Sequence, residues 1–407
     1  MQTPGIPDAP DEGHARPPPG AGRVWDVFCR VVDNLGDAGV CWRLARGLAG
    51  RGERVRLWID EPGPLAWMAP AGAPGVQVLR WPEPWLCAGT PFDPGDVIVE
   101  AFGCDLPGAV LAAMAARAGT PRGAPLWLDL EYLSAQPWVA RSHGLPSPQF
   151  HGLGAGLTRW FFFPGFGPGT GGLLREPGLL QARAAFDRDA WLAARGLARR
   201  PGEQVLVLFC YDGAPAVAQL PRAWAQAAGA GPLSVLLTPG PAQRAGAQLT
   251  WPAGTRVHAL PWLAQDDFDQ LLWSADLATV RGEDSLVRAI WAGVPFLWQA
   301  YPQHDGAHAA KVEAMLDATA AAAPVAAPLA AAWRTWNGTA DAFAEAPAGA
   351  LLPGSEPPGC AAAAELHLPP LQPWRSAVHD WRDRMAAEPD LVSQLLGFAS
   401  THQARAG

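Results

Sequence analysis

The chain has 407 residues, 49% hydrophobic and 17% charged, which is enough apolar material for two domains or one large one. Its net charge of −8 argues against a protein that binds nucleic acid over its surface. No apolar run reaches the roughly 18 residues of a membrane span, and the start of the chain lacks the basic and apolar regions of a signal peptide. Six scattered cysteines without a CxxC pair suit reduced thiols, so we expect a cytoplasmic protein without a membrane partner.

The first part of the chain predicts repeated strand–helix units. Residues 1–22 are polar and rich in Pro and Gly, and we expect a disordered tail there. From residue 23, the strand-like run VWDVFCRVV is followed by AGVCWRLARGLAG, whose helical spacing places an apolar stripe opposite Arg43 and Arg46. Further strand-like runs follow in RVRLWID, GDVIVEAFG and PLWLDLEYL. This alternation is typical of a parallel sheet.

The rest of the chain predicts a second α/β unit. Residues 140–175 are rich in Gly, Pro and aromatic residues and predict loops, whereas a new alternating series begins at VLVLFCYDG. Helices are expected in the Ala/Pro-rich stretch 315–370 and at the end of the chain. We therefore predict an α/β protein with one domain at 23–198 and a second at 199–375.

An acidic loop follows the first predicted strand. Asp33 and Asp37 lie where this strand gives way to its helix. One interpretation is structural, with Asp33 and Asn34 in a turn and Asp37 capping a helix that starts near Ala38. The other is a general base that faces a cleft, since ligands of parallel sheets bind beyond the carboxyl ends of the strands. A neighbouring carboxylate would raise the pKa of that base or hold a cationic acceptor.

A second strand–turn–helix run lies in DLATVRGEDSLVRAIWAG, residues 276–293. Arg281 and Gly282 turn the chain, and a helix is expected to begin near Asp284 or Ser285. Backbone N–H groups at a helix start beside an arginine suit a diphosphate. Ordinary helix capping by Asp284 or Ser285 is the alternative.

Three other motifs carry weaker signals. FCYDG, residues 209–213, ends a predicted strand, and its rings suit either a nucleobase or a core. GLGAGL and PGFGPGTGG lack the fingerprints of dinucleotide and P-loop sites, so they predict ordinary loops. His304, Asp305 and His308 form an H-D-x-x-H pattern without a clear third ligand, so we predict no metal site.

Taken together, several blocks of the sequence resemble the bacterial protein-arginine rhamnosyltransferase family EarP, whose members mature elongation factor P. The blocks include VVDNLGDAGVCW, IVEAFGCDLP, FFFPGFGPGTGGLLRE, FCYDG, QDDFDQLLW and VRGEDSLVRAIWAG. The resemblance implies a GT-B fold, in which two Rossmann-like domains face each other across a cleft. These would be an acceptor-side domain at 23–198, completed by helices at about 376–407, and a nucleotide-sugar-binding domain at 199–375. It also implies an inverting, metal-independent transfer of L-rhamnose from dTDP-β-L-rhamnose to an arginine side chain of elongation factor P, with no cofactor besides this donor.

The resemblance also implies roles for three acids. Asp37 would be the general base, Asp33 would assist it and hold the acceptor, and Glu283 would be a third essential acid. This agrees with elementary chemistry, because a guanidinium is protonated and a poor nucleophile until carboxylates orient it and accept its proton.

The substrate-binding positions that the resemblance implies are Asn34, Gly36, Phe209, Tyr211, Gln265, Arg281, Gly282, Asp284 and Ser285. Arg281, Asp284 and Ser285 would hold the diphosphate, partly through backbone N–H groups. The two aromatic residues and Gln265 would lie around the thymine and its sugar.

One departure from the family and three other functions qualify this hypothesis. The two residues after the tyrosine of FCYDG are usually Glu-Asn in the family and are Asp212-Gly213 here, which puts side-chain contacts from them in question. A GT-B glycosyltransferase with a small-molecule or envelope-glycan acceptor would keep the donor site without needing two acids. A non-catalytic binding module would bind the donor without turnover. An NAD-dependent oxidoreductase is disfavoured because its phosphate fingerprint is missing.

Overall fold

The computed structural model describes residues 22–32, 35–81, 92–228, 231–302, 306–321, 324–340 and 364–403. The predicted tail, apart from Gly22, lies outside these residues, as do Asp33, Asn34, His304 and Asp305. No helix among the described residues has both the length and the apolar character that a membrane span requires.

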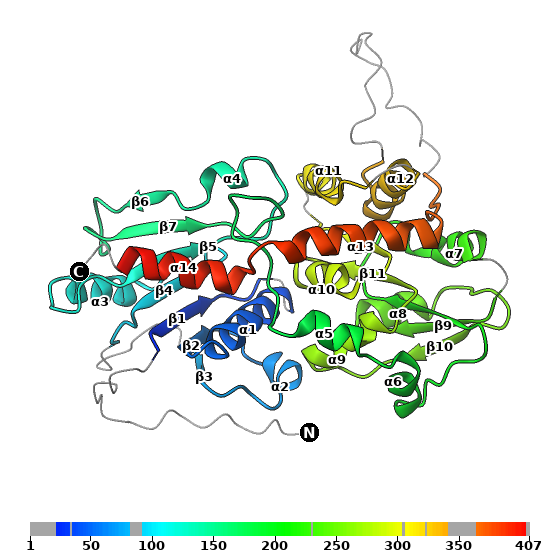
Figure 1. Cartoon of the computed structure of the whole chain (residues 1–407), viewed down its shortest axis with the longest axis horizontal. Helices are drawn as coiled ribbons and strands as arrows, with labels where there is room; N and C mark the ends of the chain where they lie inside the picture. The colour runs from blue at the N-terminus through cyan, green and yellow to red at the C-terminus, as the bar shows by residue number, and fades with distance from the viewer. Residues whose placement is uncertain are drawn as a thin grey trace, which may run out of the picture.

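The first half of the chain forms a seven-stranded sheet in the order β3-β2-β1-β4-β5-β7-β6 (Figure 1). Its strands are β1 (Val24–Cys29), β2 (Arg54–Ile59), β3 (Val76–Arg80), β4 (Val97–Ala101), β5 (Leu126–Leu130), β6 (Pro146–Pro148) and β7 (Thr158–Phe162). Neighbouring strands are parallel except for β6 with β7. Its longer helices are α1 (Gly36–Ala49) and α3 (Gly108–Ala118), and its short ones are α2 (Leu65–Met68) and α4 (Val139–Ser142).

The two faces of this sheet bury different cores. Val27 and Val99 pack with α1 on one face, whereas Phe28 and Ile98 pack with α3 on the other. The opposite directions follow from the two-residue period of a strand, and the apolar stripe of α1 supplies the matching helix face.

The second half forms a five-stranded parallel sheet in the order β10-β9-β8-β11-β12. Its strands are β8 (Gln204–Leu208), β9 (Leu233–Leu237), β10 (Arg256–Ala259), β11 (Leu277–Arg281) and β12 (Phe296–Gln299). Its helices are α7 (Leu220–Ala228), α8 (Pro241–Gly246), α9 (Gln265–Trp273), α10 (Asp284–Ala292), α11 (His308–Thr319) and α12 (Ala326–Asn337), with a 3₁₀ turn at Val217–Gln219. Two α/β halves therefore lie side by side, as predicted (Figure 1).

The region predicted as loops at 140–175 contains two strands, β6 and β7, and in this respect the prediction was wrong. Strand β7 pairs in parallel with β5, and β6 pairs antiparallel with β7 at the edge of the sheet. The run TRWFF has the β-branched and aromatic residues of a strand, although Gly and Pro surround it. Both ends of β6 are prolines, which an edge strand tolerates because no partner needs their N–H.

The last two helices connect the halves. Helix α13 (Leu371–Ala387) packs on α10 and α11 of the second half, and α14 (Leu391–Gln403) packs on α1 and β5 of the first (Figure 1). The helices α5 (Leu179–Ala184) and α6 (Arg188–Ala194) precede the predicted boundary at residue 198, yet Leu179 and Leu192 pack in the core of the second sheet. The boundaries drawn from the sequence stay predictions.

Candidate active site between the two halves

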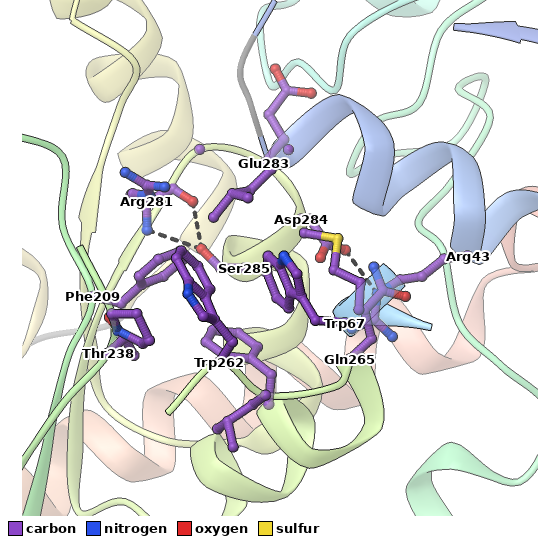
Figure 2. A pocket seen from close by; sticks show the side chains of 17 residues that line it. Arg43, Trp67, Phe209, Thr238, Trp262, Gln265, Arg281, Glu283, Asp284 and Ser285 are labelled. Carbon is purple, nitrogen blue, oxygen red and sulfur yellow. Dashed lines mark hydrogen bonds and ion pairs between the residues drawn. The ribbon is translucent and has the colours of Figure 1, made fainter. Parts of the chain in front are cut away.

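A cavity of about 730 Å³, open to solvent, lies between the halves near the end of β11 and the start of α1 (Figure 2). We call it the interdomain cavity. Its place beyond the strand ends is where parallel sheets bind ligands. It is lined by Leu35, Gly36, Arg43, Trp67 and Met68 of the first half and by Phe209, Thr238, Pro239, Trp262, Leu263, Gln265, Phe268, Arg281, Gly282, Glu283, Asp284 and Ser285 of the second.

A tight turn between β11 and α10 forms one wall of this cavity. Gly282 has a φ of +61°, a left-handed conformation that favours glycine, and α10 begins two residues later at Asp284. The Ser285 hydroxyl accepts a hydrogen bond from the Arg281 N–H at 2.9 Å and donates one to the Arg281 carbonyl (Figure 2). Ser285 thus stabilises the turn. The first N–H groups of α10, like those at the start of any helix, have no partner within the helix.

The aromatic residues of FCYDG support Arg281. Its guanidinium carbon lies 4.6 Å from the ring centroid of Phe209 and 4.4 Å from that of Tyr211, within the range of cation–π contact. One guanidinium nitrogen also donates to the Cys210 carbonyl at 3.3 Å. Phe209 lines the interdomain cavity, but Tyr211 lines a neighbouring one, so the two rings do not share one pocket.

The side chains of Asp284 and Gln265 point to the opposite half. Asp284 Oδ1 lies 3.0 Å from Arg43 Nε, and Gln265 Nε2 donates to the Gly39 carbonyl at 3.0 Å. Burial raises the pKa of Asp284, and Arg43 opposes that rise. Both predicted substrate-binding residues therefore also join the second half to α1.

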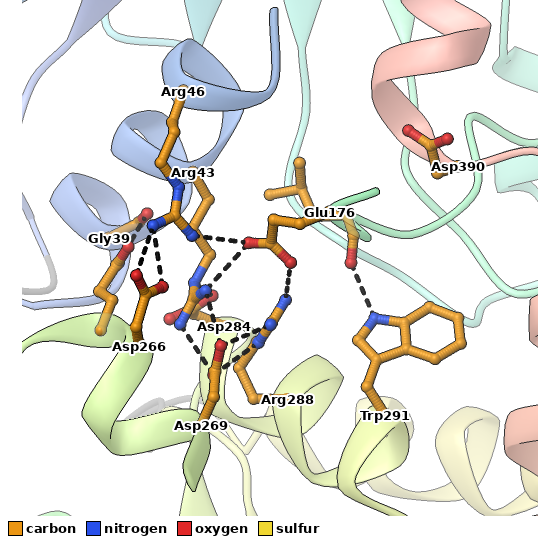
Figure 3. A network of polar contacts seen from close by, with 12 residues as sticks. Gly39, Arg43, Arg46, Glu176, Asp266, Asp269, Asp284, Arg288, Trp291 and Asp390 are labelled. Carbon is orange, nitrogen blue, oxygen red and sulfur yellow. Dashed lines mark hydrogen bonds and ion pairs between the residues drawn. The ribbon is translucent and has the colours of Figure 1, made fainter. Parts of the chain in front are cut away.

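A buried ionic network lies beside these contacts (Figure 3). Asp269 on α9 pairs with Arg43 at 3.0 Å and with Arg288 at 2.6 Å, and Glu176 bridges the same two arginines at 3.0 and 2.7 Å. Burial would raise the pKa of Glu176, but Arg288 and then Arg43 hold that pKa well below its usual range. Arg43, predicted opposite the apolar stripe of α1, is buried because Asp269 and Asp284 of the second half contact it.

A second cavity of about 720 Å³ shares Gly36 and residues 282–284 with the first. We call it the acidic cavity because Asp37, Glu283 and Asp284 line it. Its other lining residues are Val32, Gly36, Val40, Phe102, Tyr132, Tyr211, Gly282, Tyr301 and Lys311.

Asp37 lies in the first turn of α1 and does not cap it. The helix begins at Gly36, and Leu35 occupies the cap position without a side-chain hydrogen bond, so the cap interpretation was wrong. The Asp37 carboxylate is buried and accepts a hydrogen bond from the Val32 N–H at 2.8 Å. This donor holds the carboxylate at the wall of the acidic cavity, which Tyr132 also lines.

Glu283 joins the two halves at the point where the cavities meet. Its Oε2 accepts a hydrogen bond from the Leu133 N–H at 2.8 Å. Gly36, at the start of α1, lines both cavities. Asp33 and Asn34 fall outside the described residues, so their predicted roles stay predictions. Asp212 is exposed and pairs with Arg244 at 2.8 Å, which is consistent with its departure from the family pattern.

The sequence did not single out Trp67, Trp262 or Arg43 as site residues. The rings of Trp67 and Trp262, one from each half, lie 4.5 Å apart at the interdomain cavity (Figure 2). Each stands alone among loop or short-helix residues, and only the folded chain brings them together. The sequence signal that could have identified Arg43 as a site residue is its position on the same helix as Asp37.

Comparisons with known proteins identify the family of the chain. Residues 25–400 match the family described as Elongation-Factor P (EF-P) rhamnosyltransferase EarP. The protein-arginine rhamnosyltransferases of Pseudomonas aeruginosa and Pseudomonas putida are 40% and 42% identical, and each alignment covers 92% of this chain and 98% of the relative. A solved structure, described as the structural basis for EarP-mediated arginine glycosylation of translation elongation factor EF-P, is 29% identical with a TM-score of 0.55, and the match covers 93% of this chain and 99% of that one. The chain therefore belongs to the EarP family of elongation-factor P rhamnosyltransferases, which confirms the predicted family, GT-B fold and enzyme class.

Proposed function

We propose that this protein transfers L-rhamnose from dTDP-β-L-rhamnose to an arginine side chain of elongation factor P, with inversion at the anomeric carbon and without a metal. The observation that carries the proposal is the junction of the two cavities at Gly36 and residues 282–284. One cavity offers a helix start and an arginine to a diphosphate, and the other offers a buried carboxylate to a cation. Because the acceptor is a translation factor, the proposed reaction takes place in the cytoplasm.

The donor would occupy the interdomain cavity. Its diphosphate would lie at the start of α10 beside Arg281, where helix dipole and guanidinium stabilise the charge that the leaving dTDP gains. The thymine and its sugar would lie near Phe209 and Gln265. Since the Asp284 carboxylate is paired with Arg43, we assign its predicted contact with the diphosphate to its backbone N–H.

The acceptor arginine would enter the acidic cavity. Asp37 would accept a proton from the guanidinium as a nitrogen attacks the anomeric carbon, while the bond from that carbon to the diphosphate oxygen breaks. Attack opposite the leaving group inverts the anomeric centre. Asp33 and Glu283 would hold the guanidinium, and the position of Glu283 between the cavities suits that role.

The test is to incubate the protein with dTDP-β-L-rhamnose and elongation factor P and to measure the mass of the intact acceptor and of its peptides. We expect one rhamnose on one arginine, and no modification of an acceptor in which lysine replaces that arginine. Folded protein that binds dTDP but modifies no arginine would contradict the proposal. A small-molecule product in its place would support the glycosyltransferase with a different acceptor.

A further inference from the structure

The chain leaves β4 in an unusual backbone conformation beside the acidic cavity. Phe102 has a φ of +59°, and Asp105 follows with +53°. Residues with a Cβ rarely adopt this conformation because it strains the backbone, and glycine would adopt it freely. The Phe102 N–H donates to the Leu130 carbonyl of β5 at 2.7 Å, which fixes the strained residue against the neighbouring strand. A bulky side chain in a strained position at a cavity suggests that the side chain has a function.

The Phe102 ring stacks on Tyr132. The two ring centroids are 4.5 Å apart and the ring planes differ by 15°. Both rings line the acidic cavity together with Asp37 and Glu283, and 38% of Tyr132 is exposed. Burial, followed by the charges of Asp37 and Glu283, raises the pKa of Tyr132, so its hydroxyl keeps its proton.

We propose that Phe102 and Tyr132 form an aromatic platform that stacks on the guanidinium plane of the acceptor and makes the site select arginine over lysine. The inference rests on the proposed function and extends it to acceptor specificity. Carboxylates such as Asp37 and Glu283 attract any cation and do not by themselves distinguish the two side chains. A guanidinium is planar and weakly hydrated and stacks on aromatic rings, whereas an ammonium is a compact, strongly hydrated charge.

The platform is tested with variants that keep or remove each ring. Phe102→Gly removes a ring and relieves the backbone strain, Tyr132→Ala removes the other ring, and Tyr132→Phe keeps the ring but loses the hydroxyl. Trp138→Ala is the matched control, because Trp138 is 41% exposed on the same half and its ring contacts Phe163. For each variant, the dissociation constant of elongation factor P is measured with dTDP present, for the arginine acceptor and for its lysine counterpart. Rhamnose transfer and dTDP affinity are measured in parallel.

We expect Phe102→Gly and Tyr132→Ala to weaken binding of the arginine acceptor by roughly 3- to 30-fold, with little change for the lysine acceptor or for dTDP. Tyr132→Phe should keep the preference for arginine, and Trp138→Ala should change nothing. An unchanged arginine-to-lysine ratio in both ring-removing variants would overturn the platform, whether or not rhamnose is transferred. If the unaltered protein transfers no rhamnose but its arginine preference disappears in these variants, the platform stands and the proposed function fails.

Discussion

Arg43 on α1 and Asp284 at the start of α10 form an ion pair of 3.0 Å across the two halves. Asp37 lies six residues before Arg43 on the same helix, and Asp284 lies three residues after Arg281. The pair therefore connects the helix of the proposed base to the helix start of the proposed diphosphate site. Because Arg43 also contacts Asp269 and is buried, the distance between the two parts of the site depends on this network.

Replacing Arg43 by methionine should destabilise the protein strongly. The variant leaves the buried carboxylate of Asp269 and the partly buried carboxylate of Asp284 with fewer cations, which we expect to lower the free energy of unfolding by about 3–5 kcal/mol. Denaturation in urea measures the change. The control is Arg122→Met, since Arg122 pairs with Asp93 where both side chains are nearly half exposed, and its loss should lower that free energy by less than about 1 kcal/mol. Equal effects of the two substitutions would show that the network is not important for stability.

Arg281 should be needed for binding dTDP. Arg281→Met removes the charge beside the start of α10 and the contacts with Phe209 and Tyr211, and we expect the dTDP dissociation constant to rise about 10- to 100-fold. Arg281→Lys keeps the charge but loses the planar stacking, so its dTDP dissociation constant should lie between those of the unaltered protein and of the methionine variant. Titration calorimetry gives the constants. A methionine variant that binds dTDP as tightly as the unaltered protein would place the diphosphate elsewhere.

Asp129 on β5 should make stability depend on pH. Burial, followed by the charges of Glu100 and Glu131, raises the pKa of Asp129 to about 7, while Arg159 at 3.3 Å opposes the rise. The unfolded chain has the ordinary value of about 3.9, so between these values the folded state binds more protons. The contribution of Asp129 to stability is therefore present below about pH 4 and is lost as the pH rises to about 7.

Asp129→Asn cannot lose a proton and should escape this loss. Relative to the unaltered protein, we expect the variant to gain about 1–3 kcal/mol in free energy of unfolding between pH 4 and pH 8. Urea denaturation at several pH values measures the difference, with Asp93→Asn as a control at an exposed carboxylate. A difference between Asp129→Asn and the unaltered protein that stays constant with pH would contradict the raised pKa.

Local sequence patterns were sufficient to predict most strands of the two sheets and the place of the candidate site. The two series of strand and helix runs follow from apolar spacings of two residues and of three to four residues, which can be read from short segments of the sequence. The same patterns place Asp37 and Arg281 beyond strand ends, where parallel sheets bind ligands. Strand β7 was missed because its five residues stand between Gly/Pro-rich segments.

Contacts between the halves could not be predicted in this way. Arg43 has the spacing of an exposed residue on an isolated helix, and only the second half, more than two hundred residues later, covers it with Asp269. The left-handed backbone conformation of Phe102 could not be predicted either, because nothing in the surrounding sequence distinguishes this residue from a core phenylalanine. The proposed specificity of the site depends on such long-range contacts.

The most direct test of the account is the turnover of Asp37→Asn under saturating donor and acceptor. Asparagine keeps the size of the side chain but accepts no proton, so we predict that kcat falls by about 10²- to 10⁴-fold while the dTDP dissociation constant stays within about twofold. Rhamnosyl-arginine formed by this variant at nearly the rate of the unaltered protein would contradict the assignment of Asp37 as the base.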